Sequence, residues 1–312
     1  MSKNKIFIII VSFNAKEWIV KCINSIITSS IHCEIVLVDN CSSDETLQVV
    51  ANYTNLTVLP QSNNLGFGAA SNIGISFALK NNADYVFLLN QDAYLESNTI
   101  DKLIKVHKTN HEFGIISPIH LNGDGTKLDK NFANYSKENN ELLFDAIKCN
   151  FTKSIYHVPF VNAAAWLLPR NTIETIGGFD PIFFHYGEDD NYCQRAKYHN
   201  IKVGIVPNSF IYHDRENRAN SMIVNKSKIS SDNYYERFLK IKWGNINNIN
   251  IDNEIEKKNK ALKKSILKLV LKLKFKKAQI IFRELKLVKK ILPEILKSRK
   301  LNEHTGNNYI NN

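Results

Sequence analysis

Acidic side chains at two strand ends of this 312-residue sequence suit chemistry on a phosphorylated ligand. Asp39 directly follows the apolar run EIVLV, and Asp92 comes two residues after a second such run, YVFLLN. Carboxylate oxygens are hard ligands of the kind that Mg²⁺ or Mn²⁺ prefers, and these ions neutralise diphosphates. The sequence therefore predicts a Mg²⁺ or Mn²⁺ ion held by Asp92.

A second acidic group, Glu188, Asp189 and Asp190, begins a predicted helix. Acids at a helix N-terminus are favoured by the helix dipole, which is a purely structural explanation. The three aromatic residues within 183–186 favour a catalytic one, because an apolar wall makes a nearby carboxylate more basic. We therefore expect a general base in this group.

The elements that must position these residues alternate regularly over the first ninety positions. Buried strands are predicted at 6–11, 34–38, 55–59 and 85–89, with helical patterns between them, including one over 67–79. This order predicts an α/β fold whose mainly parallel sheet is covered by helices on both faces. Such sheets bind ligands at the carboxyl ends of their strands. Polar residues gather at these ends, and they include Ser12, Asn14, Asp39, Asn40, Asn63, Asn90 and Asp92.

A glycine-rich phosphate loop is missing from the first strand–helix turn, SFNAKE. That turn lacks the dinucleotide fingerprint, and the sequence holds no GxxxxGK[ST] motif. Gly66-Phe67-Gly68 follows the third strand without a third glycine and is interpreted as a close-packed helix start. Something other than a glycine loop must neutralise the phosphates, which again favours a metal at Asp92.

Seven segments, taken in order over roughly residues 5 to 215, resemble the inverting family-2 glycosyltransferases of GT-A fold. They are IIIVSFN, IVLVDNCSSDET, NLGFGAASNIGI, VFLLNQDAYL, AAWLLPR, IGGFDPIFFHYGEDDNYCQR and VPNSFIYHD. The resemblance is strongest to the rhamnosyltransferase-like branch of bacterial surface-polysaccharide synthesis. It implies transfer of a sugar, with inversion, from a UDP- or dTDP-sugar such as dTDP-rhamnose. The implied acceptor is a hydroxyl of a glycan or lipid-linked saccharide.

The resemblance also implies a donor site and a metal site. It places Ser12, Asn14 and Asp39 around the nucleoside, with Asp39 contacting the pyrimidine. Asn90-Gln91-Asp92 stands where relatives carry a DxD motif, so Asp92 is expected to bridge the metal to the diphosphate, with His213 as a further ligand. The donor site so predicted consists of Ser12, Asn14, Asp39, Asn40, Asn63, Gly66, Asn90 and Asp92.

For catalysis, the resemblance matches Asp189 to the base that deprotonates the acceptor. Where relatives often read EDxD, this chain has Glu188-Asp189-Asp190-Asn191, so Asp190 is the alternative base. Trp166 is expected beside the acceptor, and packing in the core is an equal alternative. Two other functions stay open: a nucleotidyltransferase and a non-catalytic nucleotide-sugar-binding protein.

Positive charge is concentrated near the C-terminus. Residues 257–300 contain 17 Lys and Arg against two acids, whereas the rest of the chain is mildly acidic. We therefore predict a GT-A domain over 1–245, with a nucleotide-binding half (1–110) and an acceptor half (111–245). A linker and a basic amphipathic helical tail follow over 246–312, and Pro293 is expected to break or kink the second tail helix.

The basic tail indicates a partner. An amphipathic helix rich in lysine suits an anionic bilayer, so we expect peripheral binding to the inner face of the cytoplasmic membrane. A homodimer is the second interpretation, and nucleic-acid binding is not expected, since no recognition module is visible. The first apolar run is too short for a signal peptide, no run approaches about 20 residues, and the five cysteines form no CxxC pair. These features predict a cytosolic protein.

Overall fold

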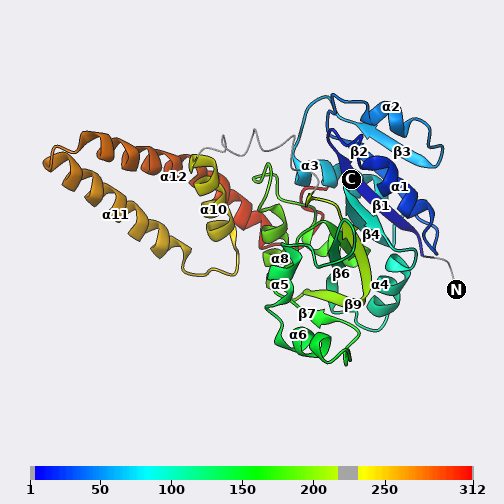
Figure 1. The fold of residues 1–312 in the computed structure, drawn as a ribbon. Helices are drawn as coiled ribbons and strands as arrows, with labels where there is room; N and C mark the ends of the chain where they lie inside the picture. Colours follow the sequence, from blue (N-terminus) through cyan, green and yellow to red (C-terminus); the bar gives the residue numbers. More distant parts are fainter. Residues whose placement is uncertain (1–3, 217–230, 311–312) are drawn as a thin grey trace.

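The computed structural model describes residues 4–216 and 231–310, and it shows an α/β body from which a long helical hairpin projects (Figure 1). Within the described residues, nine strands form one sheet in the order β3-β2-β1-β4-β8-β6-β9-β5, with β7 paired to β9. The strands are β1 (Ile6–Ser12), β2 (Glu34–Asp39), β3 (Leu56–Pro60), β4 (Tyr85–Asn90), β5 (Ala93–Leu95), β6 (Phe113–Asn122), β7 (Tyr156–His157), β8 (Ala165–Pro169) and β9 (Lys202–His213).

Helices cover both faces of this sheet and also form the projecting hairpin. Those of the body are α1 (Ile19–Ile27), α2 (Thr46–Val50), α3 (Phe67–Lys80), α4 (Thr99–His107), α5 (Phe132–Ser136), α6 (Asn140–Ile147), α7 (Arg170–Ile176) and α8 (Glu188–Tyr198). The C-terminal ones are α10 (Ser231–Gly244), α11 (Ile251–Leu271) and α12 (Phe275–Asn302). Among the described residues, none of these helices combines the length and the apolarity needed to cross a membrane.

The first four strands are parallel, as predicted, and β1 lies between β2 and β4. Ser12 is opposite Asp39 in the register, and Val11 is opposite Asn90. The polar residues that follow β1, β2 and β4 therefore meet at one edge. β8 runs antiparallel to β4 beside this edge, which makes the sheet mixed.

Alternating side chains of the central strands divide the core into two layers. Ile8 and Ile10 pack with α1, α2 and α4, whereas Phe7 and Ile9 pack with α3, α7 and α8. A strand buried on both faces has no polar face, which is why β1 reads as an unbroken apolar run. The predicted α/β class with helices on both faces is confirmed.

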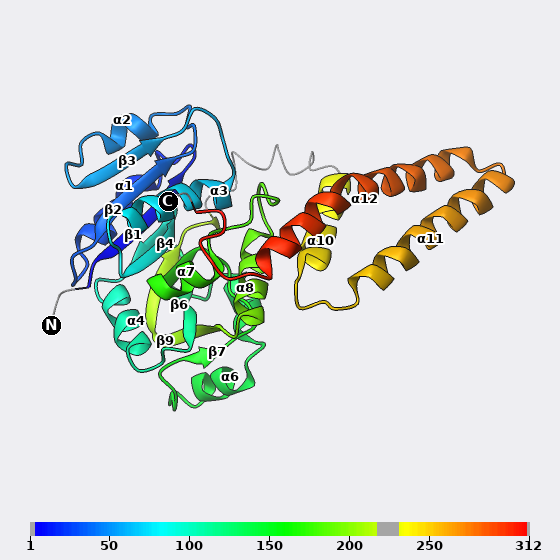
Figure 2. The same ribbon diagram turned by 180° about the vertical axis from the view of Figure 1, so that it is seen from behind.

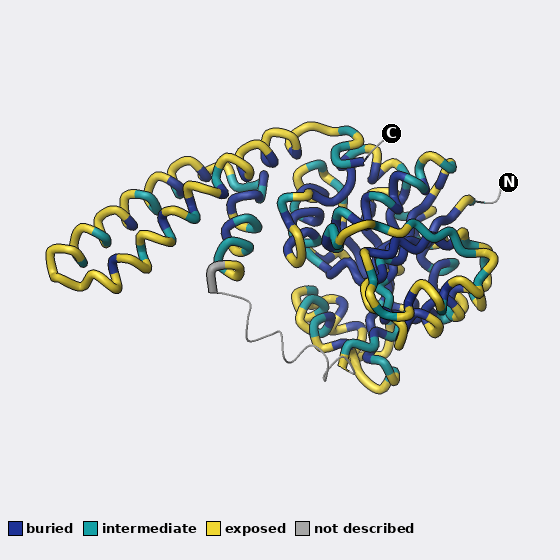
Figure 3. Tube along the Cα trace, turned by 90° about the horizontal axis from the view of Figure 1, so that it is seen from above, coloured by how far each residue is buried: buried dark blue, intermediate teal, exposed yellow. Residues whose placement is uncertain are grey.

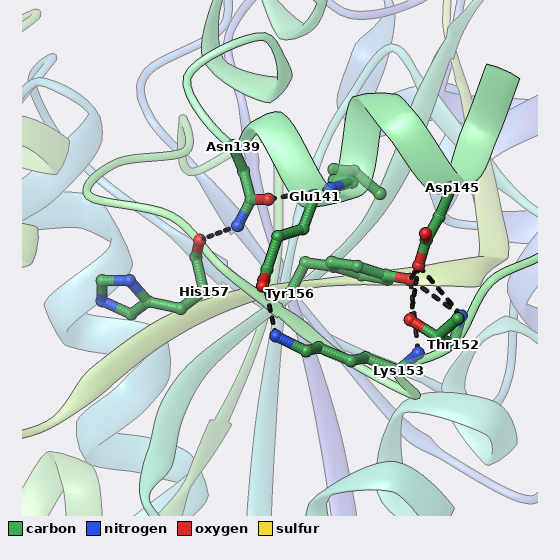
Figure 4. A network of polar contacts seen from close by, with 8 residues as sticks. Asn139, Glu141, Asp145, Thr152, Lys153, Tyr156 and His157 are labelled. Carbon is green, nitrogen blue, oxygen red and sulfur yellow. Dashed lines mark hydrogen bonds and ion pairs between the residues drawn. The ribbon is translucent and has the colours of Figure 1, made fainter.

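The segment from 132 to 152, which shows no clear periodicity in the sequence, forms the short helices α5 and α6, and a polar network holds residues 139–157 (Figure 4). The Asp145 carboxylate accepts hydrogen bonds from the Tyr156 hydroxyl and from Thr152 Oγ1, the latter at 2.6 Å. The Asn139 side chain accepts a bond from Leu142 N at 2.8 Å and so caps α6. Polar bonds between residues distant in sequence leave no periodic signal, so these two short helices could not be predicted.

The basic tail forms two helices, α11 and α12, which pack against each other and against α10 through one apolar cluster. Most of the remaining hairpin surface is exposed (Figure 3). α12 continues through Pro293, so the predicted break is wrong, whereas the alternative of a kink stays a prediction. Proline has no N–H to donate to the carbonyl four residues earlier, which belongs to the exposed residue Lys289.

The end of α12 and the residues after it return to the α/β body (Figure 2). The Asp180 carboxylate accepts hydrogen bonds from Ser298 Oγ and from Asn302 Nδ2, the latter at 2.9 Å. Gly178 N donates to Asn308 O at 2.8 Å, and Ile310 joins the core beside α3, α7 and α8. The basic segment is thus fastened to the body at its far end.

Candidate active site

Asp39, at the end of β2, organises the loops that follow the first two strands. Its Oδ1 accepts hydrogen bonds from Ser12 Oγ at 2.9 Å and Ser42 Oγ at 2.6 Å, and its Oδ2 accepts one from Ser42 N at 3.0 Å. The side chain is 1% exposed. Its carboxylate therefore holds together the loops that follow β1 and β2, and its expected contact with a pyrimidine stays a prediction.

Asn14 continues this set of hydrogen bonds between the two loops toward solvent. Its backbone adopts φ = 50°, a left-handed conformation that asparagine tolerates better than most residues. Asn14 N donates to Ser42 Oγ at 2.9 Å, and its Oδ1 accepts a bond from Ser43 N at 2.8 Å. The side chain reaches the exposed rim of the strand end, where a ligand could meet it.

Asn40, which follows β2, binds the loop that runs from β3 to the start of α3. Its Nδ2 donates to Asn64 Oδ1 at 3.0 Å, and its Oδ1 accepts from Leu65 N at 2.8 Å. Asn63 is exposed, with a 3.2 Å bond from Ser62 Oγ. Gly66 has φ = 81°, and a Cβ there would lie 1.9 Å from the carbonyl oxygen of Phe184. The glycine therefore permits close approach of the loop that leads to α8.

Asp92 and His213 lie together, fully buried, just beyond the end of β4. The distance from Asp92 Oδ1 to His213 Nε2 is 3.5 Å, and Asn90 Nδ2 is 3.4 Å from the same ring nitrogen. On its other side, the His213 ring has Nδ1 3.7 Å from the buried carboxylate of Asp129. The His213 ring thus lies between two buried carboxylates, and its Nδ1 has no hydrogen-bond partner among the described residues.

Two metal donors meet here rather than a complete cage. In the part of the chain that the structure describes, no three His, Cys, Asp or Glu residues gather as metal ligands. Mg²⁺ is usually held by one or two carboxylates together with substrate phosphates. Asp92 and His213 would supply an oxygen and a nitrogen donor to such an ion.

The predicted acidic group lies at the first turn of α8, after Gly187 in a left-handed conformation. Burial, together with the charge of Asp189, raises the pKa of Glu188 to about 8, and the charge of Arg237 opposes this rise. Burial and the charge of Asp189 raise the pKa of Asp190 to about 7. Burial also raises the pKa of Asp189, although backbone N–H groups of Asp190 and Ala163 stabilise its carboxylate. Carboxylates of raised pKa are stronger bases, as proton abstraction requires.

Backbone contacts bring this acidic group close to the candidate metal ligands Asp92 and His213. Asn90 N donates to Ala164 O at 2.9 Å, and the preceding residue, Ala163, donates its N–H to the Asp189 carboxylate. Burial and the charge of Asp189 raise the pKa of Tyr135 on α5 to about 12, and the charge of Asp129 adds to this rise. One edge of the sheet thus holds both predicted acid sites.

Arg237 of α10 faces the acids from the C-terminal region. Its charge opposes the rise in pKa of Glu188 and Asp190. The guanidinium lies 5.3 Å from the ring centres of Tyr186 and Tyr234, both more than half exposed. A cation thus lies near the centres of two exposed aromatic rings and close to the acids of α8.

Trp166 lies in the core and is not exposed beside the acids of α8, which corrects its expected place beside the acceptor. The side chain is 0% exposed and belongs to the core layer beneath α3 and α8. Its ring stacks on Phe179, with centres 6.1 Å apart, and lies 5.7 Å from the ring of Tyr192. The alternative of core packing is the one that these contacts support.

Several site residues were missed from the sequence. Ser42 and Asn64 stand next to predicted positions, within CSSDET and QSNN, and their strand-end location could have suggested them. Asp129, Tyr135 and Arg237 come from segments of weak periodicity, and only tertiary packing brings them to the site.

The sheet is mixed and mainly parallel, an acid lies beyond its fourth strand, and the acidic start of α8 lies at the same edge. Together these features are typical of a GT-A glycosyltransferase. The model of the family "Glycosyl transferase family 2" matches residues 7–167, just over half of the chain. This protein therefore belongs to the family 2 glycosyltransferases, which act on nucleotide sugars.

Individual relatives agree with this class. The chain is 29% identical to the low-salt glycan biosynthesis hexosyltransferase Agl10 of Haloferax volcanii over 206 residues, covering 63% of each chain. It is 27% identical to the rhamnosyltransferase WbbL of Escherichia coli K12, covering 69% of this chain and 86% of WbbL. The crystal structure of Staphylococcus aureus TarS 1–349 with UDP-GlcNAc matches the fold with a TM-score of 0.57 at 17% identity, covering 78% of this chain and 67% of TarS. The chain thus spans less than two thirds of the length of Agl10.

Proposed function

We propose that this protein transfers a sugar, with inversion, from a UDP- or dTDP-sugar to a hydroxyl of a glycan acceptor during synthesis of a bacterial surface polysaccharide. The observation that carries the proposal is the position of Asp189, a carboxylate of raised pKa beside the strand end that bears Asp92. The name of Agl10, a hexosyltransferase of glycan biosynthesis, supports a glycan acceptor, and that of WbbL supports rhamnose as one candidate sugar.

In this reaction the acceptor oxygen attacks the anomeric carbon as the bond from that carbon to the diphosphate breaks. The hydroxyl proton passes to the Asp189 carboxylate, and the nucleoside diphosphate departs with the bonding electrons. A positioned base of this kind contributes about 10²–10⁴-fold to the rate. Direct displacement inverts the anomeric carbon, so no covalent enzyme intermediate is needed.

Asp92 and His213 would hold the divalent ion, Mn²⁺ or Mg²⁺. When bound, such an ion acts as a Lewis acid that stabilises charge on the leaving diphosphate. Ser12, Asn14 and Asp39 would form the nucleoside side of the pocket, with Asn40, Asn63, Gly66 and Asn90 around the phosphates and sugar. Asp39 and Asn40 do so chiefly by holding the loops, as their hydrogen bonds indicate.

The experiment is a transfer assay with UDP- and dTDP-sugars and a panel of saccharide acceptors, comparing the protein with Asp189→Asn and Asp190→Asn. We expect Asp189→Asn to lower kcat by about 10²–10⁴-fold while leaving the affinity for the nucleoside diphosphate unchanged. Asp190→Asn should cost much less.

Two other results would change the proposal. If Asp189→Asn kept most of the activity and Asp190→Asn lost it, Asp190 would be the base. Absence of transfer with every donor would favour the non-catalytic nucleotide-sugar-binding protein. The nucleotidyltransferase is already disfavoured by membership of family 2.

A further inference from the structure

Most apolar residues of the amphipathic tail helices are buried where the two helices of the hairpin pack together and against α10. Leu262, Leu285 and Val288 are buried in the cluster that joins α10, α11 and α12, and Ile266 and Ile281 pack against it. A tail helix lying flat on a bilayer would therefore lack most of the apolar face that the sequence suggests.

A different apolar surface remains at the free end of the hairpin, which we call the hairpin tip (residues 267–282). Leu271 and Leu273 are each 75% exposed, and Phe275 is 58% exposed. Other exposed apolar side chains of the tip are Leu267, Val270, Ile280 and Phe282. An exposed apolar cluster of this kind marks an interaction surface. Because α12 is 28 residues long, the tip lies about 40 Å from the end of α12 that is fastened to the body (Figure 1).

Cations surround these apolar residues without compensating acids. Residues 263–283 contain eight Lys and Arg and no Asp or Glu. Nearer the body, lysines of the same hairpin are paired, such as Lys258 with Glu284 at 2.6 Å and Lys260 with Glu256 at 2.5 Å. Within the described residues, no ion pair involves a lysine of the tip.

This combination selects among partners. A nucleic acid would satisfy the lysines but leave the leucines and Phe275 in water. A second copy of the tip would cover the apolar side chains but bring two sets of uncompensated cations together. An anionic phospholipid surface satisfies both features, since it offers phosphate charge above and an apolar layer below.

We propose that the hairpin tip is a membrane-docking wedge, which inserts Leu271, Leu273 and Phe275 among the headgroups of an anionic bilayer while the surrounding lysines bind lipid phosphates. This goes beyond the transfer reaction, because it does not depend on which sugar is moved. It makes binding to vesicles separable from turnover at the active site.

The test is co-flotation of the full chain with vesicles of phosphatidylcholine alone or with added phosphatidylglycerol. We expect binding to the anionic vesicles only. The variant Leu271→Ser/Leu273→Ser/Phe275→Ser should reduce this binding at least about tenfold. Lys272→Gln/Lys274→Gln/Lys276→Gln should reduce it about a hundredfold at low salt, since each lysine near the surface contributes about fivefold.

A matched control comes from α6, where Leu143, Phe144 and Ile147 are 46%, 59% and 74% exposed. Serine at these three positions should leave vesicle binding unchanged. Transfer to a water-soluble acceptor should survive in every variant, which separates failure of docking from failure of the active site. The proposal is overturned if the wild type ignores anionic vesicles or if tip and control variants bind equally. It is likewise overturned if sedimentation shows a dimer that the tip variants abolish, or if duplex DNA displaces the vesicles through the lysines with no effect of the serine substitutions.

Discussion

At the scale of single residues, the site separates two kinds of carboxylate. Asp39 accepts hydrogen bonds from three donors of Ser12 and Ser42, so its role is to hold the loops after β1 and β2. Glu188 is 5% exposed and its Oε2 has no hydrogen-bond partner among the described residues, so burial works against its ionised form. Asp189, held by backbone N–H groups, is better placed to ionise and act as a base.

Burial of Glu188 predicts a specific dependence of stability on pH. Its pKa is about 8 in the folded protein, against an ordinary value of 4.5, so the folded state retains a proton that the unfolded chain has released. Its contribution to the free energy of unfolding therefore falls as pH rises from about 4.5 to about 8. Because glutamine imitates the protonated form, Glu188→Gln should melt higher than the wild type at pH 8.5 and nearly equal to it at pH 4.5.

Thermal melts across this pH range check the prediction, with the exposed Glu138→Gln as control. A constant difference between wild type and Glu188→Gln at all pH values would contradict it.

At the scale of elements, the strands and their polar ends were predictable, whereas the parts that complete the site were not. Buried parallel strands are recognisable in the sequence as apolar runs, and their carboxyl ends lie at one edge of the sheet. Ser12, Asp39 and Asn90 could therefore be grouped from the sequence. The contacts of Asp129 and Arg237 depend on loops and on a helix far along the chain. No periodicity encodes such packing, and the same limit explains why Trp166 could not be placed.

The loop before α3 gives a prediction at this scale. Gly66→Ala would place a methyl group against the Phe184 carbonyl in a backbone conformation that disfavours side chains. We expect a loss of about 1–3 kcal/mol in the free energy of unfolding and weaker nucleotide binding, because the loops after β3 and before α8 must separate.

Gly306→Ala is the matched control, since Gly306 also has positive φ but has no atom within 4 Å of an added Cβ. It should share the backbone strain without the effect on nucleotide affinity. Equal nucleotide affinity in the two variants would contradict the predicted contact. Denaturant unfolding and nucleotide titration provide both readouts.

At the scale of the whole molecule, the end of α12 ties the hairpin to the loop that leads to the acids of α8. Asp180 lies in the segment leading to α8, and it is bound by Ser298 and Asn302. The sequence suggested a tail beyond 245, but it gave no sign that the last residues pack beside α3. Such long-range bonds become visible only when the chain is folded.

This connection predicts that Asn302→Ala destabilises the protein by about 1–3 kcal/mol, because it removes a donor from the buried Asp180 carboxylate. It should also lower kcat more than the donor KM, since the loop before the acids loses support. The exposed Asn253→Ala on α11 serves as control. Unchanged stability and kcat in Asn302→Ala would show that the hairpin and the catalytic loop are independent.

We propose above all that the edge formed by β1, β2 and β4 binds a nucleotide sugar through a metal at Asp92. A thermal-shift experiment tests this claim most directly. The protein and Asp92→Ala are melted with UDP, dTDP, GDP or CDP, each with and without Mn²⁺. A ligand at 100 times its Kd stabilises by about 2.7 kcal/mol, which a melt can detect. We predict stabilisation by UDP or dTDP that requires Mn²⁺ and is lost in Asp92→Ala. A metal-dependent shift with none of the four nucleotides, or one that Asp92→Ala retains, would contradict the claim.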